Sequence, residues 1–264
     1  MSLKSRGEWN LPKEKKINDI LEYILKSREI KDLEHFLSPS LDDIPDSSSL
    51  FDSMSAAKLI IESVNKGKKI VIHGDFDSDG ICATSLLWDF LYRELSEFLE
   101  KKVDVIPYIP NRIEQGYGLT EDSLKDVLEL GGELLISVDC GVRDEKLIAK
   151  YQKKNLSVII TDHHQPPEDL SLELSYPLVH QMYPNHEYPF TQICGTAVVF
   201  LLIQEIRKQV GMNYSISPDS KGLDLVALAT VTDLMPLTGI NRIFVSYGLK
   251  QIATGSREGL RQLC

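Results

Sequence analysis

Short apolar runs alternate with amphipathic segments along most of the chain. The apolar runs are rich in Val, Ile and Leu on both faces, which is typical of strands buried in a parallel sheet. Around them, apolar side chains recur at helical spacing. The pattern predicts an α/β fold of three layers (α/β/α), with a five-stranded parallel sheet between helices. The predicted strands are residues 69–73, 103–109, 134–138, 156–161 and, more weakly, 178–182, and the predicted helices are residues 54–66, 81–99, 120–130 and 143–154.

The two ends of the chain have a different pattern. Two short helices are predicted within residues 13–37, followed by a connector rich in Pro, Ser and Asp at residues 38–53. The C-terminal part is predicted to be helical, at residues 193–210, 223–234 and 240–254. The sequence ends within an apparently helical region, so we expect a truncation point there. The expected domains are an N-terminal helical extension and connector at 1–53, a central α/β domain at 54–238, and the start of a linker helix at 239–264.

The composition is that of an ordinary globular protein. Of the 264 residues, 42% are hydrophobic, which is enough for a substantial core. No apolar run predicts a membrane span, and the polar start predicts no signal peptide. The four cysteines are far apart, which argues against a zinc ribbon or a disulfide scaffold and favours a reduced, cytoplasmic location. The net charge of −10 argues against a protein that binds nucleic acid over its whole surface, although a local basic groove remains compatible with it.

Acidic and histidine side chains follow directly after three of the predicted strands. They are, in chain order, Asp75, Asp77 and Asp79, then Asp139, then Asp162, His163 and His164. Because the carboxyl ends of parallel strands meet at one edge of a sheet, we expect these side chains to share one crevice. Crowded carboxylates repel one another and are costly to bury unless a cation neutralises them. The pattern therefore predicts a divalent-metal site that holds two ions.

The run from Asp75 to Gly80 also resembles the start of an EF-hand calcium loop. That loop needs a preceding helix and a glutamate at its twelfth position. Counting from Asp75, the twelfth residue is Leu86, and a strand-like run precedes the loop, so the EF-hand is excluded. A solvated acidic turn remains an alternative. His73 could add an imidazole ligand, or it could be a histidine buried at the end of a strand.

The other acidic groups also have ordinary structural interpretations. Asp139 could simply cap a helix. Asp162 could also be a helix cap, with the two histidines that follow it exposed on the surface. Asp162 could instead orient a histidine from behind, as ligand imidazoles require. A further candidate is Asp233, because an acid in an otherwise apolar helical stretch is expensive to bury without a partner. A simple aspartate at a helix end is the alternative.

The candidate ligands are mostly oxygen atoms with one or two imidazoles and no thiolate. This mixture favours manganese or magnesium over structural zinc. Two such ions, roughly 3.5–4 Å apart, would hold a phosphoryl group and supply a nucleophile for in-line attack.

The motifs in this order resemble the DHH phosphoesterase superfamily and, within it, the RecJ family of single-strand-specific DNA exonucleases. The matching runs are FLSPSL, IVIHGDFDSDGICATSLL, YIPNRIEQGYGL, ISVDCGV, VIITDHHQPPE, YPFTQICGTAVVF and LDLVALATVTDLMPLTGINR. Together they cover most of residues 33–261. The resemblance implies a metal-dependent exonuclease that cuts single-stranded DNA from 5′ to 3′ into 5′-mononucleotides, in DNA repair and recombination. It also implies the sheet order 2-1-3-4-5.

The resemblance further implies roles for individual residues. Two divalent cations are expected, with Mn²⁺ preferred and Mg²⁺ as the alternative. The implied metal ligands are Asp75, Asp77, Asp79, Asp139, His163, Asp233 and, as a supporting residue, His73. Asp139 would bridge the two ions, and His164 would contact the scissile phosphate with Asp162 beside it. The implied contacts to the nucleic-acid backbone are Arg112, Gly195 and Thr196, for which packing or a solvated charge is the alternative.

Full-length members of this family continue into a second domain with a Gly-Gly-His motif, and often into an OB fold. Neither is visible in this sequence, so we expect residues 54–238 to be the catalytic domain and residues 239–264 to begin the linker. The alternatives are a phosphodiesterase for short oligonucleotides or cyclic dinucleotides, a non-catalytic scaffold at the replication fork, and an inactive truncated fragment. The expected partner is single-stranded DNA, with a single-strand-binding protein or a helicase as further candidates. We expect a monomer that does not contact the membrane.

Overall fold

The structure is a computed structural model that describes residues 20–171, 173–186, 188–255 and 257–263, and the chain divides into two compact units. The described part of the first unit, up to Pro39, contains the helices α1 (Ile20–Ser27) and α2 (Leu33–Leu37). These are the two short helices predicted for residues 13–37, of which residues 13–19 lie outside the described part. The second unit begins at Ser40 and contains everything discussed below.

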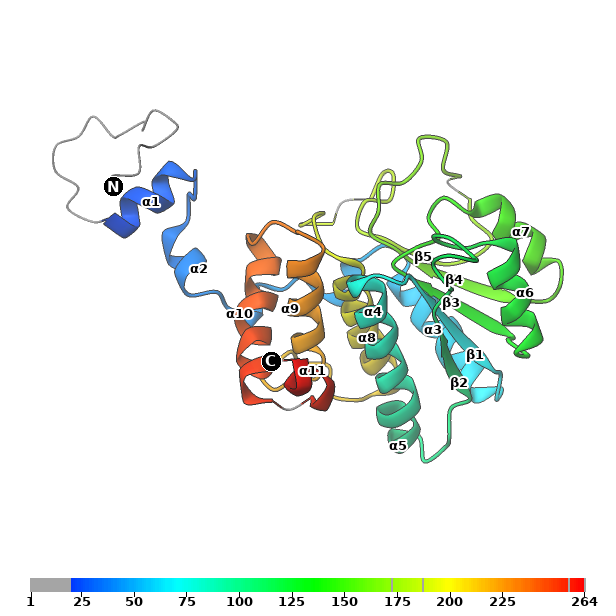
Figure 1. The fold of residues 1–264 in the computed structure, drawn as a ribbon. Helices are drawn as coiled ribbons and strands as arrows, with labels where there is room; N and C mark the ends of the chain where they lie inside the picture. The colour runs from blue at the N-terminus through cyan, green and yellow to red at the C-terminus, as the bar shows by residue number, and fades with distance from the viewer. Residues whose placement is uncertain (1–19, 172, 187, 256, 264) are drawn as a thin grey trace, which may run out of the picture. The chain divides into compact units, whose positions relative to one another are not determined.

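Five parallel strands form the sheet of the second unit, in the order β2-β1-β3-β4-β5 (Figure 1). They are β1 (Ile70–Gly74), β2 (Val105–Tyr108), β3 (Leu134–Val138), β4 (Ser157–Thr161) and β5 (Leu178–Val179). The predicted fold class and strand order are both confirmed. The fifth strand is shorter than predicted, because after Val179 His180 forms an isolated antiparallel bridge with Phe51 and the chain then turns.

Helices cover both faces of the sheet, as predicted. On one face, Ile70 and Ile72 pack in a core with α3 (Ser53–Asn65), α4 (Ser78–Asp89) and α8 (Gly195–Val210). On the other face, Val71 packs in a second core with α6 (Glu121–Glu129) and α7 (Glu145–Gln152). Neighbouring residues of a strand thus serve opposite cores, which explains why the strands are apolar on both sides. Beyond α4 and α8 lie α9 (Leu223–Thr232) and α10 (Gly239–Thr254) (Figure 1).

Several helix ends follow from local side chains. The α6 helix starts at the predicted cap, where the Thr120 hydroxyl accepts the Ser123 backbone N–H. The α4 helix starts earlier than predicted because Asp77 caps it, and it continues through a π-helical segment (Phe90–Leu95) into α5 (Ser96–Phe98). The helix predicted to begin a linker is interrupted at Gly255, whose φ of 65° ends α10. A separate short helix, α11 (Glu258–Leu263), follows.

The connector packs as part of the second unit. Its short 3₁₀ helices are Leu41–Asp43 and Ser47–Ser49. The Ser47 hydroxyl donates a hydrogen bond of 3.0 Å to Glu205 of α8, and Leu50 is fully buried. Within the described residues, no helix is long and apolar enough to cross a membrane.

Candidate metal centre

Acidic side chains meet at the carboxyl edge of the sheet. Asp75 follows β1, Asp139 follows β3, and the run from Asp162 to His164 follows β4. The chain leaves β1 and β3 toward opposite faces, into α4 and α7 respectively. Such a switch point opens a crevice at the carboxyl ends of the strands, where ligands of open α/β sheets bind.

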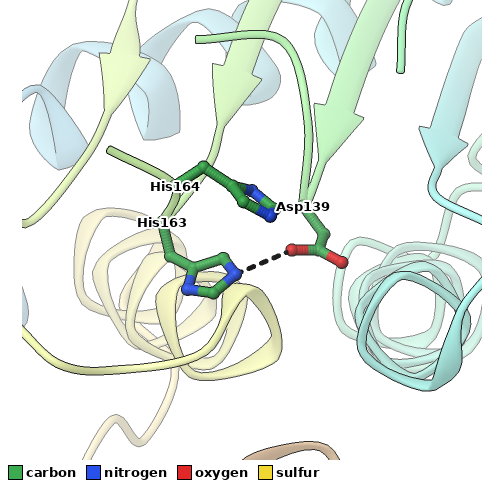
Figure 2. Close-up of side chains that lie close together, drawn as sticks. All are labelled: Asp139, His163 and His164. Carbon is green, nitrogen blue, oxygen red and sulfur yellow. Dashed lines mark ion pairs between the residues drawn. The ribbon is translucent and has the colours of Figure 1, made fainter. Parts of the chain in front are cut away.

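The potential ligand atoms form three overlapping clusters. They are Asp75 with Asp77 and Asp139, Asp79 with His163 and Asp233, and Asp139 with His163 and His164. Within each cluster the ligand atoms lie within 4.8 Å of one another. In Figure 2 the His163 ring points at the Asp139 carboxylate, with His164 beside it. The His163 Nε2 atom lies 3.2 Å from Asp139 Oδ1, 3.6 Å from Asp233 Oδ2 and 3.7 Å from Asp79 Oδ2. Shared members therefore join the clusters into one site.

Several of these atoms are buried without satisfying their hydrogen-bonding capacity. Asp75 Oδ1, Asp139 Oδ1, Asp233 Oδ2 and His163 Nε2 have no hydrogen-bond partner among the described residues. Burial, together with the nearby charges of Asp79 and Asp77, raises the pKa of Asp139 well above its usual range. Burial also raises the pKa values of Asp75 and Asp233. A cation would satisfy the unpartnered atoms and relieve the repulsion, so the donor set fits one or more divalent ions.

The N-terminus of α8 holds Asp79. Its carboxylate accepts the backbone N–H groups of Gly195 and Thr196, at 2.6 and 2.8 Å, and the Thr196 hydroxyl at 2.6 Å. The positive end of the helix dipole favours the charged carboxylate there. A Cβ atom on Gly195 would lie 2.7 Å from Asp139 Oδ1, so only glycine allows α8 to come this close.

These contacts bear on the predicted role of two residues. Gly195 and Thr196 are expected to contact the nucleic-acid backbone, but both are buried and their donors bind Asp79. The contacts favour a structural role, in which the two residues fix one candidate ligand. Their contact with nucleic acid stays a prediction that this geometry does not support.

Asp162 holds His164 in place. Its carboxylate lies 2.8 Å from His164 Nδ1 and accepts the backbone N–H groups of His163, His164 and Val142. Burial alone would raise the pKa of Asp162, but the hydrogen bond from His164 and the backbone donors outweigh burial and lower it. The same hydrogen bond raises the pKa of His164. His164 therefore presents its Nε2 atom toward the crevice in a fixed orientation.

Tyr117 also lies in the site, although its position in the sequence does not predict this. Its hydroxyl lies 3.1 Å from His164 Nε2, and its ring packs edge-to-face on Phe76. The guanidinium of Arg112 lies 4.9 Å from the centre of the Phe76 ring. Arg112 is exposed, and its contact with nucleic acid stays a prediction. The local signal for Tyr117 is weak: it stands between Gly116 and Gly118, both with positive φ.

His73 lies near the end of β1, two residues before Asp75. It is fully buried, and its Nδ1 atom is 3.9 Å from the Cys140 sulfur. Burial lowers the pKa of His73 to about 4, so the ring is neutral. None of the three ligand clusters among the described residues includes it. Its role as a ligand stays a prediction.

Comparison with known proteins identifies the family. Residues 69–230 match the model of the DHH family, N-terminal domain. The chain belongs to the DHH family. Its DHH domain therefore contains all of the clustered residues except Asp233, which lies three residues beyond the match.

The DHH chain is also similar to exonucleases of known sequence and structure. It is 35% identical over 210 residues to the single-stranded-DNA-specific exonuclease RecJ of Bacillus subtilis, covering 79% of this chain and 24% of that protein. A crystal structure of exonuclease RecJ bound to manganese matches with a TM-score of 0.68 and 33% identity, over 84% of this chain and 52% of the other. A structure of Thermus thermophilus RecJ with Mg²⁺ matches with a TM-score of 0.59 and 28% identity, over 92% and 29% of the two chains. The DHH chain thus spans about a quarter to a half of these relatives.

Proposed function

We propose that this chain is the catalytic part of a metal-dependent exonuclease that hydrolyses single-stranded DNA from 5′ to 3′ and releases 5′-mononucleotides. The observation that carries the proposal is the pair of ligand clusters joined through Asp139 and His163. The similarity to RecJ exonucleases, whose structures carry Mn²⁺ or Mg²⁺, supports the choice of reaction and of ion.

Each cluster would hold one divalent ion. Asp75, Asp77 and Asp139 would bind the first, while Asp79, His163 and Asp233 would bind the second, with Asp139 in reach of both. Carboxylates with a single imidazole suit Mn²⁺ or Mg²⁺. When bound, two such ions neutralise the carboxylates, polarise the phosphate and lower the pKa of a nucleophilic water.

The protein's own contribution to the reaction centres on His164. Asp162 keeps a proton on Nδ1 and raises the pKa of the ring, so His164 can also carry a proton on Nε2. The Nε2–H group would then donate a hydrogen bond to an oxygen of the scissile phosphate. Such a bond becomes stronger as negative charge develops during attack. In the structure the Tyr117 hydroxyl contacts this nitrogen. When substrate binds, the hydroxyl would either stay beside the phosphate oxygen or be displaced by it.

Arg112 would position the strand at the entrance. Its guanidinium is exposed beside Phe76 and can bind a phosphate oxygen without contacting the bases. A phosphate contact does not distinguish one base from another. It therefore suits an enzyme that removes nucleotides one at a time from a strand of any sequence.

The proposed setting follows from the same similarity. We propose that the enzyme acts in the cytoplasm, in DNA repair and recombination, and that a single-strand-binding protein or a helicase delivers its substrate. The described cysteines, Cys82, Cys140 and Cys194, are free and buried, in keeping with a reducing compartment. We also propose that the protein acts as a monomer.

The decisive experiment measures Mn²⁺-dependent release of mononucleotides from a single strand labelled at its 5′ end. The Asp77→Asn variant should lose this activity, because the amide keeps the helix-capping oxygen but removes the ligand charge. The matched control is Asp122→Asn, a surface aspartate paired with Lys125, which should retain it. Preference for dinucleotides over long strands would replace the proposal with the short-substrate phosphodiesterase. Activity that is independent of metal, or unaffected in Asp77→Asn, would contradict it.

A further inference from the structure

A second hollow lies on the outer face of α4, beside the end of β2. Its volume is about 290 Å³. Ile81, Thr84 and Trp88 line it from α4, at spacings that place them on one side of the helix, and Pro107 and Ile109 line it from the chain around the end of β2. Because β2 is an edge strand, no other strand among the described residues covers this side of the sheet.

The hollow and the metal centre share one helix. This helix begins directly after Asp77 and carries Asp79 in its first turn. Ile81 lies half a turn beyond Asp79, and Trp88 lies about 14 Å farther along the helix than Asp79. On the opposite wall, Ile109 precedes Arg112 by three residues. A strand that passes Arg112 and places a phosphate at the metal centre is therefore close to this hollow.

Trp88 and Arg93, which line the hollow, belong to a column of aromatic and cationic side chains that continues outside it. The rings of Trp88 and Tyr92 stack with their centres 4.8 Å apart and their planes at 12°. Arg93 lies 5.7 Å from the centre of the Trp88 ring, and Lys102 lies 5.9 Å from that of Tyr92. Tyr92 and Arg93 belong to the π-helical segment that follows α4, and such segments are frequent at functional sites. Proteins hold single strands without sequence preference by stacking bases on aromatic rings, with help from arginine.

A buried hydroxyl in the wall lacks a partner. Thr84 is only 3% exposed, and its Oγ1 atom has no hydrogen-bond partner among the described residues. This hydroxyl lies against Gly74 of β1, where a Cβ atom would stand 1.9 Å from it, so it packs α4 on the sheet and does not face the hollow. The lining of the hollow itself is mixed, with apolar side chains from α4 and β2 and a Trp88–Arg93 pair that can stack on a nucleobase.

The charges around the hollow are nearly balanced. Asp89 lies 3.3 Å from Arg93 and 3.9 Å from Arg257, and Asp224 also binds Arg257 at 2.8 Å. Affinity at this place must then come mainly from stacking and burial rather than from neutralising phosphates. The hollow thus differs from Arg112 in the kind of group it would bind, because the expected partner of Arg112 is a phosphate.

We propose that this hollow receives a base of the single-stranded DNA substrate, from a nucleotide beyond the scissile phosphate. Trp88 and Arg93 provide the stacking surface. The inference rests on the proposed function, because it assigns a further contact to the same substrate.

The chain offers a direct test, since Trp9 and Trp88 are its two tryptophans. In a Trp9→Phe background, Trp88 is the single tryptophan, and excitation at the red edge of its absorption band avoids the tyrosines. Adding a nuclease-resistant phosphorothioate oligothymidylate with Mg²⁺ should quench its fluorescence with saturation. In the otherwise unaltered protein, Trp88→Leu should weaken binding of the same oligonucleotide about tenfold, while Trp88→Phe should retain most of the affinity. The slope of affinity against salt should be the same in all three proteins.

The matched control is Tyr214→Leu. Tyr214 is an exposed ring under Lys208 that does not line the hollow, so the variant should bind as tightly as the original chain. If the original chain releases mononucleotides but Trp88 is not quenched, or Trp88→Leu binds equally well, the base pocket is refuted while the proposed function stands. That result would leave the hollow free for a protein partner. If the original chain neither binds nor cuts single strands, the proposed function fails first.

Discussion

The Asp79 carboxylate and the Thr196 hydroxyl form a hydrogen bond of 2.6 Å that ties α4 to α8. Asp79 thereby reaches the candidate metal centre with its direction already set by the N-terminus of another helix. The arrangement resembles the way proteins orient metal ligands through the residues behind them. Its importance can be measured without touching any ligand.

Replacing Thr196 with valine should weaken Mn²⁺ binding. The substitution keeps the shape of the side chain but removes the hydroxyl that orients Asp79, and losses of this kind typically cost about 10- to 100-fold in metal affinity. Calorimetric titration with Mn²⁺ measures the effect. Thr196→Ser restores the hydroxyl and should bind nearly as well as the original chain. Equal affinities for the valine and serine variants would show that the hydroxyl plays no part.

Replacing Gly195 with alanine should also disrupt the centre, for a steric reason. The new methyl group would lie 2.7 Å from Asp139 Oδ1 and 2.8 Å from its Cβ, so Asp139 or the whole of α8 must move. We expect a loss of Mn²⁺ affinity and a lower Tm. Gly259→Ala is the control, because that glycine is also helical but a Cβ there meets nothing within 4 Å. This control should be neutral or stabilise by up to about 1 kcal/mol. Similar outcomes for both variants would contradict the steric account.

Replacing Asp139 with asparagine should have opposite effects with and without metal. The raised pKa of Asp139 means that its ionised form destabilises the metal-free fold above the ordinary carboxyl range, so at neutral pH the amide should raise the Tm or leave it unchanged. Asparagine also tolerates the left-handed backbone at this position, where φ is 62°. Thermal unfolding in a chelator and in excess Mn²⁺ separates the two states. The variant should lose most of the Mn²⁺-induced rise in Tm. A large drop in the metal-free Tm would refute the view that repulsion dominates.

His180 should make the protein less stable in acid. Its Nδ1 atom accepts the Met182 backbone N–H, and its Nε2 atom lies 2.9 Å from the His164 carbonyl oxygen, so both nitrogens are satisfied in the neutral ring. Burial lowers the pKa of His180 to about 4. Because protonation then favours the unfolded chain, stability is lost as pH falls from about 6.5 toward 4, by up to about 3 kcal/mol.

Urea unfolding of the original chain and of His180→Gln at several pH values isolates this contribution. The glutamine cannot be protonated but can still donate to the His164 carbonyl. The difference in unfolding free energy between the two proteins should therefore narrow or reverse as the pH falls. A difference that does not change with pH would contradict the assignment.

The sequence is a good guide to this fold where local pattern and burial agree. The run at 134–138 is a strand as predicted, because it is apolar on both sides and lies at the centre of the sheet. The run at 178–182 is apolar too, yet only Leu178 and Val179 pair in the sheet. The limit there is set by the bridge between His180 and Phe51, a contact between segments that local sequence does not reveal.

The same distinction applies to the site. The candidate ligands that follow β1, β3 and β4 could be predicted from the sequence, because a parallel sheet brings the carboxyl ends of its strands together. The structure places Asp233 beside them, although its role as a ligand remains a prediction. The functions of Thr196 and Tyr117 could not be foreseen in this way. Each depends on hydrogen bonds between distant segments, from Thr196 to Asp79 and between Tyr117 and His164.

The order of the ligands along the chain has a consequence for how the protein is made. Asp75, Asp77 and Asp139 belong to segments around β1 and β3, while Asp233 ends α9, far toward the C-terminus. During synthesis the first cluster can close as soon as β3 pairs with β1, but the second must wait until α9 has emerged and docked. Contacts between such distant segments also form slowly. The first cluster can therefore form together with the early part of the sheet. The second cluster can form only after α9 has packed against the rest of the unit.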